Sequence, residues 1–463
     1  MAKSNFLARI NQPTDMTVGP PWKSILVFTL PMLIGNIAQQ LYSTVDSIVV
    51  GHYIGDNALA AVGSAMPIVN MLLVLFIGIS AGANIMVAQY FGAKNRDALS
   101  HTIGNCVTVT ALCCILLMAV CTPFVRPLLS LLNTPASILD WCTDYLTISV
   151  LGVAGMAYYN ILSSIVRGLG DSVSALIYLL VATVVNIVLD VYFVAALNMG
   201  VAGVALATVI AQIVSSALCL IKLARMTQYF DFGLKFMKPV KSYVVTIVKL
   251  GLPSGLTQAI FSSAMLIVQS LTNSFGELFI AANVVIMRVD GFAMMPNFSF
   301  GTAMTTYAGQ NVGANMYDRV KKGAKQGTLM AVATSTVITI IILIFGKNLM
   351  AIFSETKELV DMSYRLMLIL AVGYIAMAVT QSLSGVMRGA GDTVTPMWIS
   401  LITTVAVRVP VAYGISFLTR TPELPYGRCE CIQISLLFSW VMGAVLTAIF
   451  YRIGKWKNKK IKQ

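Results

Sequence analysis

Residues 167–171 read Arg-Gly-Leu-Gly-Asp, and residues 388–392 read Arg-Gly-Ala-Gly-Asp. The offset between the numbers of the two copies is 388 − 167 = 221. Other pairs keep this offset to within one residue: Gln89 and Gln310, Gly92 and Gly313, Leu30-Pro31 and Leu252-Pro253. Matches that stay in register over most of the chain indicate an internal duplication, so we expect two similar halves.

The composition of the chain is that of a membrane protein. Of the 463 residues, 57% are hydrophobic and 11% are charged, whereas soluble proteins carry about 25% charged residues. The net charge of +13 comes from basic residues clustered between apolar runs, which is typical of membrane loops rather than of a nucleic-acid-binding face. A soluble enzyme, a disordered chain and a fibrous protein are therefore poor interpretations, and no nucleic-acid partner is expected.

Apolar segments long enough to cross about 30 Å of hydrocarbon recur along the chain. We predict twelve spans: residues 24–50, 60–90, 101–122, 138–158, 173–196, 200–223, 244–273, 280–308, 326–346, 359–380, 396–418 and 432–453. Pro31, Pro67, Pro253 and Pro296 are the predicted kink points of the longer segments. The predicted fold is an all-α polytopic membrane protein with twelve transmembrane helices in two six-helix lobes.

Lys and Arg predict the orientation. With an even number of spans both termini share one side, and that side holds most of the basic residues, so both termini are predicted to be cytoplasmic in a multi-pass plasma (inner) membrane protein. Because each lobe also has an even number of spans, the lobes are expected to be related by a pseudo-two-fold axis along the membrane normal. The predicted parts are a cytoplasmic N-terminal segment (1–23), the N-lobe (24–223), a cytoplasmic linker (224–243), the C-lobe (244–453) and a basic cytoplasmic tail (454–463). The tail is expected either to rest on anionic membrane lipids or to act only as a topology signal.

Two parallel bundles that face one another give a central cleft, as in alternating-access transporters. The chain resembles the multidrug and toxic compound extrusion (MATE) family over nearly its whole length. The residues that carry this resemblance are Leu30-Pro31, Gln39-Gln40-Leu41-Tyr42, Asp46, Gly51, the Gln-x-x-Gly-Ala signals at 89–93 and 310–314, the Arg-Gly-x-Gly-Asp loops, and Arg408-Val409-Pro410. The resemblance implies export of organic cations or other toxic amphiphiles, driven by inward H⁺ or Na⁺.

Few ionisable residues lie inside the apolar runs: Asp46, Asp190, Arg288, Asp290 and Arg408. A charge there costs roughly 2.5–3.5 kcal/mol on insertion scales, so each is a functional candidate. Asp46, Asp190, Tyr145 and Thr208 are predicted to lie about 7 to 12 Å below the outer surface, at 1.5 Å per helical residue. Asn186 lies four residues before Asp190 and shares its helix face. Such oxygens suit a small hard cation, and the two carboxylates equally suit a shared proton.

This set resembles the N-lobe cation site of the DinF-like branch of the family: an aspartate on the first helix, Asn-x-x-x-Asp on helix 5, and supporting Tyr and Thr on helices 4 and 6. The resemblance implies cation coupling by Asp46, Asn186, Asp190, Tyr145 and Thr208, with Asp46, Asn186, Asp190 and Thr208 as metal ligands if the ion is Na⁺. The alternative for Asp46 is a capping or pairing role. Beyond the coupling ion, no cofactor is expected.

The second lobe departs from the NorM-like branch, which carries an acidic residue on helix 7. The corresponding place here reads Ile260-Phe261-Ser262, so the resemblance is to the DinF-like branch more than to the NorM-like branch. Asp290 is expected either to form a second-lobe site or to make a structural ion pair, with Arg408 as the expected partner.

Polar and thioether side chains are the candidates for lining the substrate cleft: Gln39, Gln40, Tyr42, Gln258, Gln269, Asp290, Met287 and Met294. Methionine suits a promiscuous pocket, although core filling and interhelical hydrogen bonds explain such residues equally well. Pro31 is the predicted hinge. The Arg-Gly-x-Gly-Asp loops are interpreted as gate or scaffold loops, in which glycine permits the turn and Arg and Asp lock it.

We therefore predict a secondary active multidrug efflux antiporter, acting as a monomer on small amphipathic or cationic substrates. The alternative within transport is a lipid-linked oligosaccharide flippase of the related superfamily. A membrane-embedded enzyme is disfavoured by the scarcity of catalytic residues, since the chain has two histidines and few buried acids. The eight cysteines do not suggest a disulfide framework, and a channel is disfavoured by the duplication.

Overall fold

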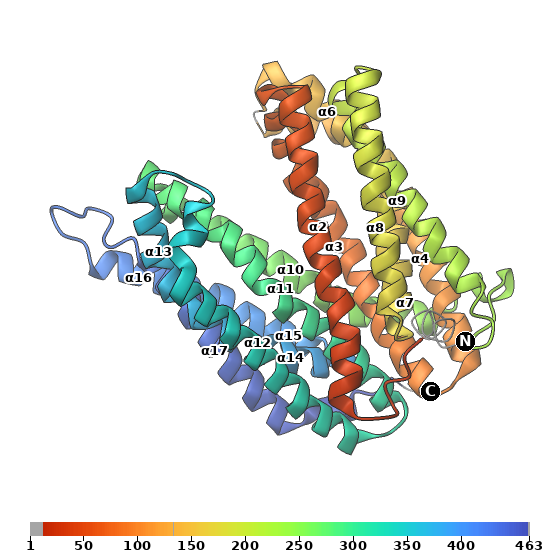
Figure 1. Ribbon diagram of the computed structural model, residues 1–463. Helices are drawn as coiled ribbons and strands as arrows, with labels where there is room; N and C mark the ends of the chain where they lie inside the picture. Colours follow the sequence, from red (N-terminus) through yellow and green to blue (C-terminus); the bar gives the residue numbers. More distant parts are fainter. Residues whose placement is uncertain (1–12, 133, 462–463) are drawn as a thin grey trace, which may run out of the picture. The chain divides into compact units, whose positions relative to one another are not determined.

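The computed structural model describes residues 13–132 and 134–461, apart from the side chains of residues 42, 43, 45–48, 56 and 59. Within these ranges the chain is helical, and its only β feature is an isolated bridge between Thr421 and Leu424. Ten helical segments of the described chain are long and apolar enough to cross a membrane, and the number rises to twelve if each of two bent helix pairs is one span. The all-α polytopic class is therefore confirmed (Figure 1).

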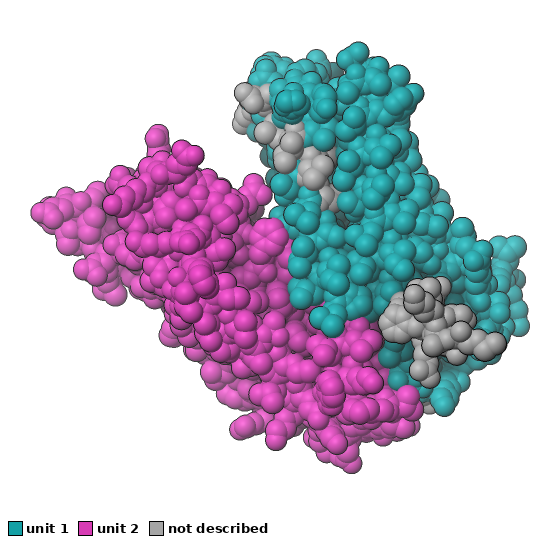
Figure 2. Space-filling view, viewed as in Figure 1, with its two compact units in different colours: residues 1–15, 30–255, 463 teal, residues 16–29, 256–462 magenta. Residues whose placement is uncertain are grey.

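The described chain divides into two compact units (Figure 2). Unit 1 holds residues 13–15 and 30–255, and unit 2 holds residues 16–29 and 256–461. The division falls inside two long helices, α2 (Pro21–Tyr53) and α10 (Lys241–Asn273). The start of α2 thus belongs to unit 2, and the start of α10 belongs to unit 1.

Unit 1 contains most of α2 and the elements that follow it: α3 (Asp56–Gly92), α4 (Arg96–Cys121), η1 (Thr122–Phe124), α5 (Val125–Leu131), α6 (Ala136–Leu151), α7 (Val153–Gly168), α8 (Ser172–Val191), η2 (Tyr192–Ala196), α9 (Gly200–Ala224) and η3 (Leu234–Met237). Its interior includes a cluster of small and branched side chains in which Val50, Val62 and Leu146 are buried. The start of α10 packs on α3 through glycines, because a Cβ atom at Gly251 would lie 2.6 Å from the carbonyl oxygen of Gly78.

Unit 2 contains the rest of α10 and the elements after it: α11 (Glu277–Gly313), α12 (Tyr317–Ala351), α13 (Lys357–Ala371), α14 (Gly373–Gly389), α15 (Val394–Leu401), η4 (Ile402–Val407), α16 (Arg408–Leu418), α17 (Cys431–Ile453) and η5 (Lys455–Asn458). The start of α2 is buried against them, since Ile25 and Phe28 are 0% and 1% exposed. Gly327 of α12 packs tightly on α11, because a Cβ atom there would lie 2.3 Å from the sulfur of Met304, and the same position is in ordinary contact with Ile25 at 3.4 Å.

The two broken spans bend at glycines that the duplication relates. α6 and α7 meet at Gly152 with a bend of 48°, and α13 and α14 meet before Gly373 with a bend of 44°. A Cβ atom would come within 2.3 Å of Val209 at the first bend and 2.5 Å of Trp440 at the second. Gly152 and Gly373 are separated by the same offset as the two Arg-Gly-x-Gly-Asp copies, so in each half the bend lets its span approach the last long helix.

The predicted proline kinks do not interrupt their helices. α2, α3, α10 and α11 each continue through a proline, at positions 31, 67, 253 and 296. Neighbouring groups and local adjustment satisfy the carbonyl that proline leaves without a donor in a membrane helix. The bends at Gly152 and before Gly373, by contrast, occur where glycine allows a close contact.

The Arg-Gly-x-Gly-Asp loops form turns that start the next helix. Gly170 and Gly391 adopt φ of 92° and 98°, in the left-handed region that glycine tolerates. Asp171 accepts the backbone N–H of Ser174 at 2.9 Å, and Asp392 accepts that of Thr395 at 3.3 Å. Each aspartate thus caps the start of the following helix.

In the first loop, Arg167 and Asp171 each bond to a different neighbour. Asp171 pairs with Lys222 of α9 at 3.1 Å, and Arg167 donates instead to the Ser164 hydroxyl at 2.7 Å. Lys222 lies far away in sequence and reaches the loop because α9 packs beside α8. The eight cysteines are free thiols in the structure.

Candidate cation site

Helix α8 carries the polar pair of the candidate site. Asn186 and Asp190 are 0% and 1% exposed, whereas Val184 and Val188 on the other side of the helix are 62% and 61% exposed. The four-residue spacing places the amide and the carboxylate on the same buried face. The sequence therefore builds a helix with one apolar outer face and one polar inner face.

The amide of Asn186 connects the carboxylate to helix α9. In the orientation that satisfies both of its atoms, Nδ2 donates to Oδ2 of Asp190 at 2.7 Å and Oδ1 accepts the backbone N–H of Thr208 at 3.2 Å. This orientation is assigned from the hydrogen-bond network. The predicted neighbours Asn186, Asp190 and Thr208 are thus brought together by two helices of unit 1.

The other predicted members of the site are placed less directly. Tyr145 of α6 is 4% exposed and lies in the apolar cluster that includes Val201 and Val204 of α9. Asp46 and Tyr42 lie on α2, and their side chains are outside the described residues. The described part of the site therefore offers the Asp190 carboxylate, the Asn186 amide and the Thr208 hydroxyl, which lies 3.3 Å from Nδ2 of Asn186 before the amide is reoriented.

These groups suit the uptake of a positive charge. A carboxylate that is 1% exposed inside a membrane helix is costly when ionised, and a neutral amide donor compensates only part of its charge. Binding a proton or a small cation removes that cost. Within the described side chains no three His, Cys, Asp or Glu residues form a cluster, so a bound metal ion would also need neutral oxygen ligands.

Unit 2 contains a different buried acid. Tyr374 of α14 donates its hydroxyl to Oδ1 of Asp290 at 2.9 Å, and the same hydroxyl lies 3.4 Å from the sulfur of Met367. Asp290 and Arg408 form no direct salt bridge among the described residues, although the two charges interact through space, and Nε of Arg408 has no hydrogen-bond partner among these residues. The tyrosine takes that place because α14 packs closely along α11. Nothing in the sequence pattern marked Tyr374.

The candidates for lining the cleft have varied environments. Gln39 and Gln258 are exposed, Gln40 is half-buried, and Gln269 donates to Asn273 on its own helix at 2.8 Å. Of the two methionines, Met287 is 44% exposed and Met294 is 7% exposed within the core of unit 2. Core packing thus accounts for Met294. Pro31 is half-buried and lies just after the unit boundary in α2.

Taken together, the fold and the buried carboxylate define a polytopic membrane protein made of two repeated helical units. The family model MatE matches residues 31–192 and again residues 253–414. The two matches begin at Pro31 and Pro253, the prolines that the duplication pairs in the sequence. The chain belongs to the MatE family of multidrug transporters.

Relatives and solved structures agree with this assignment. The chain is 28% identical over 447 residues to the probable multidrug resistance protein YoeA of Bacillus subtilis, covering 95% of each chain. It is 24% identical to the probable multidrug resistance protein NorM of Thermotoga maritima, covering 95% of this chain and 94% of that protein. The fold matches a crystal structure of MATE in complex with MaL6, with a TM-score of 0.88 and 22% identity over 96% of this chain and 99% of the other.

Proposed function

We propose that this protein is a cation-coupled exporter that exchanges organic cations or amphipathic toxic compounds for H⁺ or Na⁺. The observation that supports it is the buried network of Asp190, Asn186 and Thr208 in unit 1. A buried carboxylate changes its interactions strongly when it gains a positive charge, so its loading can favour one conformation over another. The relatives named as multidrug resistance proteins support the substrate class.

In the proposed cycle, Asp46 and Asp190 take up the ion from outside, the helices of unit 1 repack, and the substrate leaves outward. Pro31 is the proposed hinge, because the boundary between the compact units falls in α2 next to it. The Asn186-x-x-x-Asp190 pair favours the DinF-like branch. We also propose a monomer in the plasma membrane with both termini cytoplasmic, since basic residues gather in the loops on that side.

The decisive experiment is export of a fluorescent organic cation from proteoliposomes with the proton and sodium gradients imposed separately. We expect one gradient to drive export and Asp190→Asn to remove that dependence. Asp46→Asn tests the member of the site whose side chain lies outside the described residues. Export by the Asp190→Asn variant that still follows the ion gradient would exclude Asp190 from coupling.

A lipid-linked oligosaccharide flippase of the related superfamily is the second candidate. One structural neighbour, a MOP superfamily transporter from Pyrococcus furiosus, is described as having a different function that the reverse polarity of its binding pocket suggests. Dye accumulation in cells with and without the protein separates the two functions, because a flippase leaves the dye level unchanged.

A further inference from the structure

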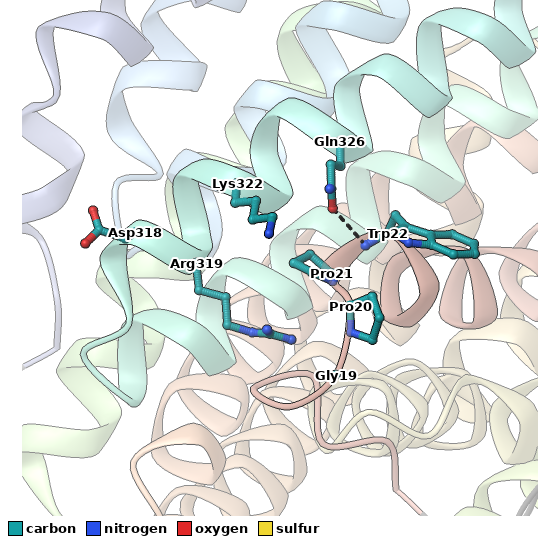
Figure 3. Close-up of a pocket in the computed structure, with 8 residues that line it drawn as sticks. All are labelled: Gly19, Pro20, Pro21, Trp22, Asp318, Arg319, Lys322 and Gln326. Carbon is teal, nitrogen blue, oxygen red and sulfur yellow. Dashed lines mark hydrogen bonds between the residues drawn. The ribbon is translucent and has the colours of Figure 1, made fainter.

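A pocket of about 530 Å³ lies in unit 2, where α2 begins beside the first turns of α12 (Figure 3). Its lining combines a turn rich in proline and glycine with polar side chains: Gly19, Pro20, Pro21, Trp22, Asp318, Arg319, Lys322 and Gln326. Neither the buried acids nor the predicted cleft residues contribute to it. It is therefore a separate site.

The wall of the pocket is held in place by residues of α11 and α12. Gln310, from the second Gln-x-x-Gly-Ala signal, accepts the backbone N–H of Met16 at 2.9 Å. Arg319 donates to the carbonyl oxygens of Met16 at 3.1 Å and Val18 at 2.9 Å. Gln326 accepts the backbone N–H of Trp22 at 3.1 Å. The turn before α2 is thus fixed on a frame of side chains, and the pocket is a built feature.

The pocket has an excess of positive charge. Lys322 forms no hydrogen bond or ion pair with any described residue, and Arg319 bonds only to backbone carbonyls. Asp318 points away from the turn in Figure 3, and its carboxylate is neutralised by Lys321 at 2.9 Å. In the same view the amine of Lys322 points toward Pro21. The lining therefore carries two cations and one acid, and that acid is paired with Lys321, which does not line the pocket.

The surroundings of the pocket are those of a membrane boundary. Trp22, at the start of the first span, is 47% exposed, as is typical of aromatic residues at the level of the headgroups. Farther along the two helices, Val27 of α2 is 47% exposed and Leu329 of α12 is 66% exposed. Leu329 lies seven residues beyond Lys322, about 10 Å deeper at 1.5 Å per residue. The cations thus sit at the mouth of a surface that becomes apolar toward the hydrocarbon.

From this arrangement we propose that the pocket binds the phosphate-bearing headgroup of an anionic phospholipid. The Lys322 amine binds the phosphate. The Arg319 guanidinium, which backbone carbonyls hold in place, adds a positive charge nearby, and Trp22 packs at the level of the glycerol backbone. Basic pockets at the membrane surface between transmembrane helices recognise anionic headgroups in this way. The apolar continuation past Leu329 favours a lipid over free phosphate, because the acyl chains gain a surface to lie on.

Native mass spectrometry of the purified full-length protein tests this site. The probes are short-chain phosphatidylglycerol, short-chain phosphatidylcholine and inorganic phosphate, each titrated against the wild type, Lys322→Gln and Lys325→Gln. Lys325 is the matched control, because it is an exposed lysine of α12 that does not line the pocket. We expect a saturable phosphatidylglycerol adduct that Lys322→Gln weakens about fivefold and Lys325→Gln leaves unchanged, as one lysine contributes about that much to headgroup binding.

Equal weakening by the two variants would show attraction by the general surface charge and would overturn the site. Inorganic phosphate that competes as well as the lipid would reassign the pocket to a free anion. Equal binding of phosphatidylcholine would remove the requirement for an anionic headgroup. Thermal denaturation of both variants accompanies the titrations, and unchanged melting temperatures show that a lost adduct reflects the site.

Discussion

Units 1 and 2 contain the same Arg-Gly-x-Gly-Asp turn, but different side chains face its aspartate. In unit 1, Asp171 is 1% exposed and pairs with Lys222, whose side chain is 11% exposed. The duplication pairs Lys222 with Gly443, and Asp392 has no ion pair among the described residues. The repeat thus keeps the backbone turn and the helix cap while the buried charge varies.

The candidate sites differ in the same way. The residues that the duplication pairs with Asn186 and Asp190 are Val407 and Val411, so unit 2 has no copy of the pair. Its buried acid is Asp290, on another helix and with a tyrosine as hydrogen-bond donor. The duplication thus supplied two equivalent scaffolds. We expect only the first of them to carry the coupling ion.

Removing one acid from each unit tests whether only unit 1 carries the coupling ion. Asp190→Asn is expected to lower ion-driven export at least about tenfold, which corresponds to ~1.4 kcal/mol of coupling free energy. The Asp290→Asn variant is expected to keep an export rate within about fivefold of the wild type, because the substitution alters one hydrogen bond worth ~1 kcal/mol. Initial rates in proteoliposomes under a fixed gradient measure both. Equal losses would mean that the units share the coupling role.

Because of this ion pair, the stability of unit 1 should depend on Lys222. Lys222→Met leaves the buried Asp171 carboxylate without this partner, and we expect a loss of about 3 kcal/mol in the free energy of unfolding. The double variant Asp171→Asn/Lys222→Met should recover much of that loss, since no charge stays buried. Thermal unfolding in detergent compares the two. A double variant no more stable than Lys222→Met would show that the lysine acts through packing alone.

The glycines at the two bends test a feature that the units share. Gly152→Ala and Gly373→Ala should each destabilise the protein by about 1–3 kcal/mol, because the new methyl group overlaps the facing helix. Gly63→Ala and Gly291→Ala are the matched controls, since nothing lies within 4 Å of a Cβ atom there. The controls should change stability by less than about 1 kcal/mol. Similar melting temperatures for all four variants would contradict the close contact at the bends.

The smallest effect is expected where the linker contacts the start of α4 within unit 1. Arg96 holds Asp231 at 2.6 Å and the carbonyl oxygens of Thr227 and Gln228 at 2.7 and 3.1 Å, on the surface of the protein. Arg96→Ala should speed hydrogen exchange in residues 226–240 without changing the melting temperature, because exposed pairs contribute little. Exchange of the tail, where Lys460 contacts Asn315 at 2.8 Å in unit 2, should not change. Faster exchange in the tail would show that the variant acts beyond the linker.

The same contact predicts a pH dependence. Hydrogen bonds from Arg96 lower the pKa of Asp231 below its ordinary value. The contact is therefore complete above the ordinary pKa of aspartate and is lost as the pH falls through the lowered pKa. Hydrogen exchange of the linker should accelerate in that acidic window in the wild type but not in Arg96→Ala.

Much of the fold could be predicted from the sequence because its signals are local or periodic. Apolar run length indicated the spans, the constant offset between matching motifs indicated the duplication, and glycine with a following aspartate indicated the turns. The partners of buried charges could not be predicted in this way. Lys222 reaches Asp171 and Tyr374 reaches Asp290 only after helices pack, and a pattern along one chain does not specify which side chains then meet.

The candidate site was predictable to the extent that it lies on one helix. Asn186 and Asp190 share a face of α8 by spacing alone, and the polar character of that face was visible in the sequence. The role of the amide as a bridge to the backbone of Thr208 depends on the distance between α8 and α9, which spacing does not determine.

The shared helices α2 and α10 also constrain how the protein is made. Residues 16–29 are synthesised long before residues 256–461, yet both segments belong to unit 2. Conversely, unit 1 is complete only with residues 241–255, which are synthesised after its last complete helix. A chain cut in the linker would leave each fragment without a strip of its interior. Neither unit can therefore be completed before segments from both halves of the chain have been synthesised.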